Sequence, residues 1–494
     1  MQFDLIHLAP LVALAHLLGA IAACHAILHT RTSQGAVAWA VALVTVPYLT
    51  LVPYLFLGRS RFTGYDDSRT IGRESLRSQR HQDEWATRIS TYGQPAADLG
   101  HPLVRSLTRL AGMPFLSGNS VRTLVNGEAT FEAIFAAIAQ AQNYVIVQFF
   151  IVRADALGDR LKHALLERAA HGVKVYLLYD SIGSFDLPHR YIAALRAGGV
   201  ETHSFSTRRF VNRFQLNFRN HRKIVVVDGE RAFVGGLNVG VEYLGAKPPL
   251  SPWRDTHIEV RGPAVAGIQM IFKEDWYWAT QQQLGFATAK APDIAAATAA
   301  TVATPAAANA SDHMHCLVMA SGPADRQETA SLFLVEAIHA ARERIWLTSP
   351  YLVPDEAVFT ALRLAVLRGV DVRILIPSRR DHVVVFEAST LYAFDCVRAG
   401  VRIFRYQPGF LHQKVVLIDS LAAAIGSANL DNRSLRLNFE IMLLTVDRDF
   451  AAEVETMLLH DFSLAREIDA DEYLKAPAWR RMGMHLARLF APIL

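Results

Sequence analysis

Cysteine is scarce in this sequence: the 494 residues contain only Cys24, Cys316 and Cys396. Their number is odd and they lie far apart, so the sequence has neither a disulfide framework nor the closely spaced pairs that ligate structural zinc. We therefore expect a reducing compartment, no metal site built on cysteine and no bound cofactor.

Charged residues are also few. They make up 19% of the chain against 51% hydrophobic residues, and the formal net charge is only +4. So small an excess does not by itself indicate a nucleic-acid partner, and we expect none. The apolar composition instead points to membrane segments, and the slight positive charge is compatible with an anionic membrane surface.

Two long apolar runs stand near the N-terminus. Residues 5–28 and 36–57 are almost unbroken in apolar side chains, and each approaches the ~20 residues that a membrane-spanning helix needs. The short connection between them predicts a transmembrane hairpin over residues 1–58. A cleaved signal peptide is the alternative, but no basic segment precedes the first run and a second run follows it. Pro47 and Pro53 are expected to kink the second span or to end it.

Arginines gather on one side of this predicted hairpin. The connecting loop contains Arg31, whereas the segment after the second run contains Arg59, Arg61, Arg69, Arg73, Arg77 and Arg80. The positive-inside rule then predicts that the chain after the hairpin lies in the cytoplasm, as part of a multi-pass protein of the cell membrane. Residues 59–119 are interpreted as a polar connector near the membrane surface.

The rest of the chain alternates apolar strands with helices, in two halves that share one plan. In the first half, 120–285, strands are predicted at 144–152, 173–180, 200–206, 221–228, 231–236 and 256–262. In the second half, 312–470, they are predicted at 344–353, 370–377, 401–407, 412–419, 422–427 and 439–447. The pattern indicates two similar α/β/α halves, each with a sheet covered on both faces.

Two further segments have a composition of their own. Residues 286–311 are rich in Ala, Thr and Pro, which predicts a linker between the halves. Residues 471–494 combine arginines with Trp479, Leu486 and Phe490, which is typical of an amphipathic helix on an anionic membrane surface. A packed core helix is the alternative for this last segment.

One short motif occurs once in each half. His221, Lys223, Asp228 and Asn238 recur at the same spacing as His412, Lys414, Asp419 and Asn429. The two blocks also share a Val, an Ala and a Gly at equivalent places. Most of the matches are polar or conformationally special residues, which a shared apolar period would not produce.

These residues suit chemistry on a phosphodiester. A His and a Lys two positions apart on a strand point to the same face, and two such faces would surround one anion with two imidazoles and two ammonium groups. We therefore place the site at a seam between halves related by a pseudo-two-fold axis. Two lysines neutralise the charge of a diester, so no metal is expected.

The double H-x-K-x4-D pattern, each copy followed by G-[GS]-x-N, resembles the phospholipase D superfamily. The surrounding sequence narrows this to a resemblance to bacterial cardiolipin synthases, which runs nearly end to end. The segments that match are 253–257, 349–351, 354–356, 432–434 and 437–440, together with the two apolar runs.

The resemblance implies an enzyme that joins two phosphatidylglycerol molecules without a nucleotide or a catalytic metal. By analogy His221 is the nucleophile that forms a phosphohistidine and His412 the general acid and base, although near symmetry leaves the reverse assignment open. Lys223 and Lys414 would neutralise the phosphate oxygens. Asn238, Asn429 and Ser427 are predicted to bind them as well, and Ser434 is a weaker candidate.

Four carboxylates are candidate partners of these groups. A histidine used in this way needs a carboxylate on its other nitrogen, and Asp255 and Glu440 are expected to serve, each on or beside a later strand of its own half. The motif acids Asp228 and Asp419 are included among the catalytic candidates, with capping of a turn as the favoured alternative.

Several readings of the activity remain open at this point. The same residues would serve a phospholipase D that releases phosphatidic acid, or a synthase that uses phosphatidylethanolamine as co-substrate. A nuclease and a non-enzymatic membrane scaffold are more distant alternatives. Acyl-chain preference and oligomeric state are not determined by these patterns.

Overall fold

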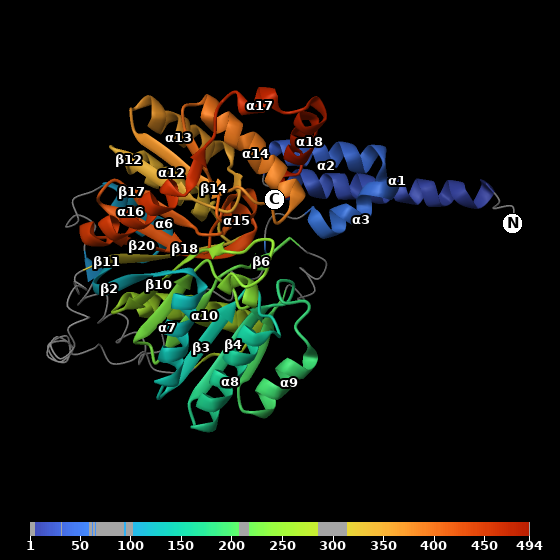
Figure 1. Ribbon diagram of the computed structural model, residues 1–494. Coiled ribbons are helices and arrows are strands. Elements are labelled where there is room, and N and C mark those ends of the chain that lie inside the picture. Colours follow the sequence, from blue (N-terminus) through green and yellow to red (C-terminus); the bar gives the residue numbers. More distant parts are fainter. Residues whose placement is uncertain are drawn as a thin grey trace.

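The computed structural model describes residues 5–30, 32–58, 62, 65, 93–94, 102–206, 217–284 and 314–493. The predicted linker at 286–311, most of the predicted connector, and the arginines on which the orientation rests lie outside these residues. In the described part, two α/β halves are stacked on one another and an arm of helices projects from one side (Figure 1).

The arm consists of α1 (Leu5–His29), α2 (Ser33–Thr45) and α3 (Pro47–Leu57). Within α1, Pro10–His29 is long and apolar enough to cross a membrane, whereas α2 and α3 are shorter. The second apolar run is divided at Pro47, as predicted, because proline lacks the N–H that a continuing helix needs and favours the first turn of a new one. Among the described residues, one uninterrupted helix of span length therefore stands where two were expected.

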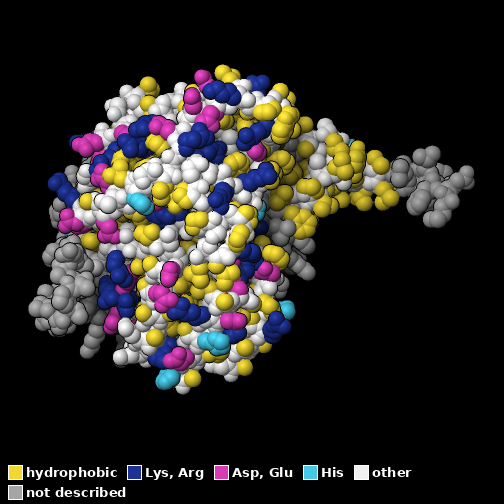
Figure 2. Space-filling model, in the orientation of Figure 1, with side chains coloured by type: hydrophobic (Ala, Val, Ile, Leu, Met, Phe, Trp, Pro, Cys, Tyr) yellow, Lys and Arg dark blue, Asp and Glu magenta, His cyan; other side chains and the backbone are white. Residues whose placement is uncertain are grey.

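α2 and α3 fold back against α1. Ala23 and Ala26 pack against Leu43 and Tyr54, and the Tyr54 hydroxyl lies 2.7 Å from Nδ1 of His25. The outward faces are apolar, with exposed side chains that include Leu11, Leu14, Leu17, Ile21, Val37, Val41, Leu49 and Val52. They form the continuous hydrophobic surface of the arm in Figure 2. An apolar surface of this extent indicates membrane association.

The first half is built on a mixed sheet in the order β5-β4-β3-β7-β8-β10-β2. These strands are β5 (Glu201–Phe205), β4 (Lys174–Asp180), β3 (Tyr144–Phe149), β7 (Ile224–Val227), β8 (Arg231–Gly235), β10 (Thr256–Arg261) and β2 (Phe115–Val125). β3, β4 and β5 run parallel and the remaining pairs are antiparallel.

Helices cover both faces of this sheet because its central strands are apolar on both sides. Val145 and Val147 face a core made with α7 (Asn126–Ala139), α8 (Ala156–Ala170) and α9 (His189–Ala197). Ile146 faces the opposite core, which is closed by α10 (Ala264–Thr280). The predicted α/β/α arrangement is thus observed for this half.

The second half repeats the plan in the order β21-β15-β14-β12-β17-β18-β20-β11-β2. Its strands are β21 (Ala465–Glu467), β15 (Arg402–Tyr406), β14 (Asp371–Pro377), β12 (Arg344–Thr348), β17 (Val415–Ile418), β18 (Ala422–Gly426), β20 (Asn438–Val446) and β11 (Met314–Ser321). Its main helices are α12 (Thr329–Ala340), α13 (Glu356–Leu367), α14 (Val383–Arg398) and α16 (Arg448–Ser463).

β2 joins the two sheets, since it pairs with β10 of the first half and with β11 of the second. It begins inside the range predicted to be connector, as does α6 (Pro102–Ala111), whose Leu103 and Leu107 are buried in the core. The predicted boundary at residue 119 is therefore wrong. The polar residues of β2, among them the buried Asn119, interrupt the apolar pattern by which a strand is recognised.

The C-terminal segment forms α17 (Glu472–Lys475) and α18 (Ala478–Arg488). α18 packs on the body: Ala487 lies against Ala388 of α14, and Arg488 pairs with Asp395 at 2.6 Å. Its other side is apolar and exposed, with Trp479, Met482, Leu486, Leu489 and Phe490. In Figure 1, α18 stands at the end of the body from which the arm projects. Its packed side fits the core-helix alternative, whereas contact of its apolar side with a membrane stays a prediction.

Candidate active site between the two halves

Short strand pairs between the halves bring His221 and His412 into one site. β6 (Arg219–Asn220), directly before His221, pairs with β20 of the second half. β16 (Phe410–Leu411), directly before His412, pairs with β9 (Trp253–Arg254) of the first half. The N–H of His221 donates to the Phe439 carbonyl at 2.9 Å, and that of His412 donates to the Arg254 carbonyl at 2.7 Å. Each histidine is therefore fixed against the opposite half.

The two His-x-Lys tripeptides lie just before strands β7 and β17, where the sequence placed them inside the strands. The ammonium group of Lys223 donates to the carbonyl of His221, and that of Lys414 donates to the carbonyl of His412. In the second copy Nζ of Lys414 also lies 3.0 Å from Nδ1 of His412, so these two side chains lie on one side of the tripeptide. All four residues are at least nine-tenths buried in the seam.

Each histidine is oriented by a carboxylate from the other half. Nδ1 of His221 lies 3.0 Å from both carboxylate oxygens of Glu440, and Nδ1 of His412 lies 2.7 Å from Oδ2 of Asp255. Both are carboxylates that the sequence named, and both are fully buried. Each faces the histidine of the opposite half, because β9 and β20 each pair with the strand before the opposite motif. The carboxylate holds the Nδ1–H, which leaves Nε2 for chemistry.

Ser427 supports Glu440 instead of a phosphate. Its hydroxyl donates to Oε2 of Glu440 at 2.6 Å, so its single hydrogen is already engaged. Ser434 and Asn438 donate to Oε1 of the same carboxylate at 2.8 and 3.1 Å. The prediction that Ser427 binds the substrate phosphate is corrected accordingly. Ser434 and Asn438 likewise hold the carboxylate of Glu440 in place.

Asp255 is held more simply. Its Oδ1 accepts the N–H of Thr256 at 2.8 Å, and the chain passes close to it at Gly236. A Cβ on Gly236 would stand 2.2 Å from Oδ1 of Asp255. The glycine in the first motif is therefore required by the carboxylate that orients His412.

Asn238 and Asn429, predicted to bind phosphate, are placed differently from one another. Oδ1 of Asn238 accepts the N–H of Ile151 at 3.1 Å and its amide group donates to the Tyr243 hydroxyl at 3.2 Å, so this side chain ties loops together. Asn429 donates to Asp431 at 3.3 Å, and its buried Oδ1 has no partner among the described residues. Asn429 is thus the better placed of the two to meet a ligand.

The motif acids Asp228 and Asp419 lie at the far ends of β7 and β17, roughly 16 Å along an extended chain from the lysines. Asp228 accepts the N–H groups of Gln142, Asn143 and Tyr144, and Asp419 does the same for residues 342–344. Both have a left-handed backbone, with φ of 53° and 50°. Their inclusion among the catalytic residues is corrected, because they cap the turns that precede β3 and β12.

Burial and the two lysines shape the protonation of the site. The pKa of His221 and that of His412 each fall to about 4, first because of burial and further because both Lys223 and Lys414 repel a proton. Burial also lowers the pKa of Lys414 to about 8 and that of Lys223 well below its ordinary value. Each lysine acts on both histidines, so the four groups form a single electrostatic unit. The negative charge of a phosphodiester would raise all four pKa values again.

Two buried ion pairs behind the histidines were not predicted. Arg222 donates to Asp275 of α10 at 2.7 Å and to the Glu440 carbonyl at 3.1 Å. Arg254 donates to Asp461 of α16 at 2.6 Å, and so links the first half to the second. The only signal in the sequence was a charged residue beside an apolar strand, and this pattern does not predict which acidic residue forms the ion pair.

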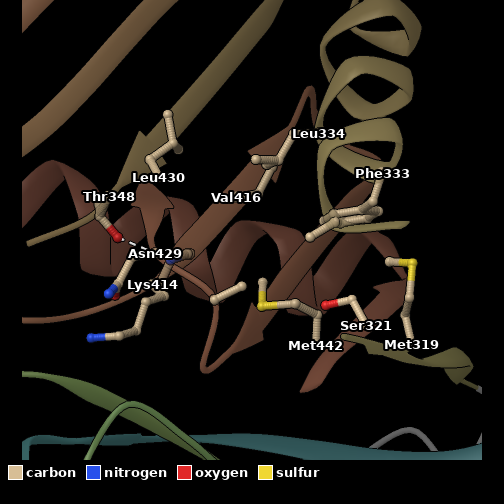
Figure 3. A pocket seen from close by; sticks show the side chains of 13 residues that line it. Met319, Ser321, Phe333, Leu334, Thr348, Lys414, Val416, Asn429, Leu430 and Met442 are labelled. Atoms are coloured by element: carbon tan, nitrogen blue, oxygen red, sulfur yellow. Dashed lines mark hydrogen bonds between the residues drawn. The ribbon is translucent and has the colours of Figure 1, made fainter. Parts of the chain in front are cut away.

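A small pocket lies beside Lys414. Its walls are apolar and include Met319, Phe333, Leu334, Val416 and Met442, while Lys414 and Asn429 form a polar edge. In Figure 3 the polar ends of Lys414 and Asn429 point to the same side, away from Phe333 and Met319. The pocket thus places a cationic side chain beside apolar ones. Among the described residues, no group of three His, Cys, Asp or Glu side chains is placed to hold a metal ion.

Comparison with known proteins agrees with this geometry. A family model described as "Cardiolipin synthase, PLD-like domain" matches residues 134–276 and 334–462, and one described as "Phospholipase_D-nuclease N-terminal" matches residues 17–59. Cardiolipin synthase A of Pseudomonas fluorescens is 56% identical over 98% of this chain and 98% of its own length. This chain belongs to the cardiolipin synthase family. It is therefore a phosphatidyltransferase, as the motifs predicted.

Other relatives extend the comparison. Cardiolipin synthase A of Pseudomonas aeruginosa is 56% identical over 97% of this chain and 94% of its own length. Among solved structures, phosphatidylserine synthase of Haemophilus influenzae superposes with a TM-score of 0.60 at 15% identity, and the match covers 79% of this chain and all of that protein. Together with the family model, which matches each half, this similarity confirms the fold with two repeated phospholipase D-like halves.

Proposed function

We propose that this cardiolipin synthase transfers the phosphatidyl group of one phosphatidylglycerol to a second, and so forms cardiolipin and glycerol. One observation carries the proposal: two histidines, each held at Nδ1 by a carboxylate of the opposite half, share one buried site with two lysines. Such a site has two Nε2 atoms for covalent and acid–base work, and cationic groups for one diester.

In the first half-reaction, Nε2 of His221 attacks the phosphorus and the bond from phosphorus to the glycerol oxygen breaks. Protonated His412 gives its Nε2 proton to that oxygen, so glycerol leaves as a neutral alcohol. Lys223 and Lys414 bind the phosphate oxygens, and Asn429 lies beside Lys414. The bound anion is what raises the pKa of His412 enough for it to carry this proton.

In the second half-reaction, a glycerol hydroxyl of another phosphatidylglycerol gives its proton to Nε2 of His412. Its oxygen attacks the phosphorus and the bond between phosphorus and His221 breaks. His221 and protonated His412 are then back in their starting states. The two steps together consume two phosphatidylglycerols and release one cardiolipin and one glycerol.

The surroundings of the two carboxylates support this division between the histidines. Glu440 shares its charge among Ser427, Ser434, Asn438 and His221. Asp255 accepts the Thr256 N–H and faces His412 at the shorter distance. A carboxylate with fewer donors keeps more negative charge for an imidazolium, which suits the histidine that carries the proton.

We also propose that the two halves are related by a pseudo-two-fold axis. In addition, we propose that α2 and α3 together make a second membrane crossing and that the catalytic body lies in the cytoplasm. α2 and α3 pack against α1 and expose apolar faces, and the exposed face of α18 would rest on the lipid surface. A reporter that is active only in the cytoplasm, fused after Leu494, tests the orientation. Its inactivity would contradict the proposal.

The purified full-length protein in vesicles of phosphatidylglycerol tests the reaction. We expect cardiolipin and glycerol in equal amounts. Phosphatidic acid without cardiolipin would contradict the synthase and indicate a hydrolase. Incorporation of labelled phosphatidylethanolamine into cardiolipin, in mixed vesicles and at the expense of glycerol release, would assign the co-substrate to that lipid instead.

A further inference from the structure

A pair of arginines, one from each half, lies beside the site and takes no part in the steps above. Arg219 belongs to β6 and is separated from His221 by one residue. Arg433 belongs to α15 (Asn432–Arg436), and one of its guanidinium nitrogens donates to the Asn217 carbonyl at 2.7 Å. Arg433 is therefore bound to the segment that carries Arg219.

The fold holds these two positive charges near one another. The pKa of Arg219 falls to about 10, first because of burial and then because Arg433 is close. Asp180 acts on both guanidinium groups. Asp180 also accepts the N–H groups of Ile182, Gly183 and Asn220 at 2.7 to 2.9 Å, and Arg219 donates to the Phe218 carbonyl at 3.1 Å. Two neighbouring guanidinium groups that are only partly exposed form a strong site for a multivalent oxyanion.

The position of the pair relative to His221 is as informative as its charge. Residues i and i+2 of an extended chain project to the same side and are roughly 7 Å apart. Arg219 therefore lies on the same side as the imidazole of His221, displaced by about that distance. The lysines occupy the reaction centre itself, so the arginines mark a second anion position close to the first.

A buried acceptor lies on the strand that pairs with β6. Asn438 stands opposite Arg219 in the β6–β20 pair, and its amide group donates to Glu440 at 3.1 Å. Its Oδ1 is buried and has no hydrogen-bond partner among the described residues. A buried acceptor of this kind is costly unless a ligand donates to it, and a glycerol hydroxyl is such a donor.

The chemistry of the second half-reaction requires such an arrangement. The acceptor lipid has a phosphodiester of its own, joined through the three-carbon glycerol bridge to the hydroxyl that attacks. While the first phosphate is bonded to His221, the second must therefore be held nearby as a separate anion. Water has no such phosphate. A site for the phosphate of the acceptor lipid would therefore also favour transfer over hydrolysis.

We propose that Arg219 and Arg433 bind the phosphodiester of the acceptor lipid, and that Asn438 accepts a hydrogen bond from its glycerol group. The inference rests on the proposed function and adds a place for the second substrate. The three residues are then determinants of acceptor choice, distinct from the groups that form and break bonds.

The experiment offers two acceptors to the same phosphatidyl donor. Full-length R219Q, R433Q and wild-type protein are incubated in phosphatidylglycerol vesicles with ethanol, and cardiolipin and phosphatidylethanol are both measured. Ethanol has no phosphate, so its transfer reports the fold, the donor and the two histidines. R160Q, which removes an exposed arginine paired with Glu132 far from the seam, is the matched control.

We expect the ratio of cardiolipin to phosphatidylethanol to fall roughly tenfold to a hundredfold in R219Q and in R433Q, the usual effect of losing a charge-assisted hydrogen bond. The ratio should stay unchanged in R160Q. Equal loss of both products would overturn the inference, because the arginines would then serve the donor or the fold. An unchanged ratio would overturn it too. Failure of the wild-type protein to make any cardiolipin would instead contradict the proposed function. That failure would be seen in the wild-type sample, whereas failure of the inference is seen only in the variants.

Discussion

Glu440 and Asp255 do the same work from opposite halves, but their surroundings differ. Glu440 lies in β20 and accepts hydrogen bonds from two serines, an asparagine and His221. Asp255 follows β9 and accepts one backbone N–H and His412, in a space that Gly236 leaves open. The duplicated motif thus carries two unequal carboxylates, and this inequality can separate the nucleophile from the acid and base.

The residues between His and Lys differ in the same way. Arg222 is tied to Asp275 within its own half and to the Glu440 carbonyl across the seam. Gln413 donates to Asp461, and Asp461 in turn pairs with Arg254 of the first half. Duplication of a motif therefore preserves the reacting groups, while their support is free to diverge.

The largest effect is expected from the histidines themselves. H221A and H412A should each reduce cardiolipin formation at least ~10³-fold, because neither covalent attack nor proton transfer has a substitute. With a phosphatidyl donor whose leaving group needs no proton, H412A should still form an acid-labile phosphoenzyme and H221A should form none. Phosphoenzyme in H221A alone would reverse the assignment.

The carboxylates should come next. E440Q and D255N preserve shape but no longer fix the Nδ1–H, and we expect losses of roughly 10² to 10⁴-fold. The donor with the good leaving group should rescue the first half-reaction of D255N more than that of E440Q, since Asp255 supports the acid. Burst kinetics measures this half-reaction, and equal rescue of the two variants would contradict the comparison.

A pH profile gives a smaller but graded effect. The pKa of Lys414 lies at about 8, so its charge is present below that pH and lost above it. We expect kcat/KM to fall up to tenfold per pH unit above pH 8. Unfolding of the protein does not explain such a loss of activity. Between pH 8 and 10.5, Lys414 binds more protons in the unfolded protein than in the folded one, so its contribution to the free energy of unfolding increases as pH rises. A flat profile to pH 10 would contradict the role of Lys414.

The smallest effect on turnover is expected at the motif acids. D228N and D419N each weaken a carboxylate that accepts three backbone N–H groups, so we expect a loss of about 1–3 kcal/mol in the free energy of unfolding. Activity per folded molecule should change less than about twofold. Denaturant titration and assays on the same samples check both values. A hundredfold loss of turnover in a stable variant would restore a catalytic role.

Much of the fold was predictable because the catalytic body follows strong local rules. Apolar β-branched strands such as Val225–Val227 and the helices between strands lie close to their predicted ranges. β2 and β11 were not recognised, since β2 has buried polar residues and its partners are distant in sequence. The break at Pro47 followed from proline chemistry, but the loss of a second helix of span length required the structure.

By itself, the sequence predicted the groups that we propose to react, two histidines and two lysines, because a polar motif repeats at fixed spacing, and it named two carboxylates beside them. Only the tertiary structure decided which carboxylate serves which histidine, because β9 and β20 cross the seam and local spacing contains no information about the other half. It likewise moved Ser427 from the phosphate to Glu440 and placed Asp228 and Asp419 away from the site. The type of a residue determines which reactions its side chain can perform. Which residue it contacts depends on how segments far apart in the chain pack together.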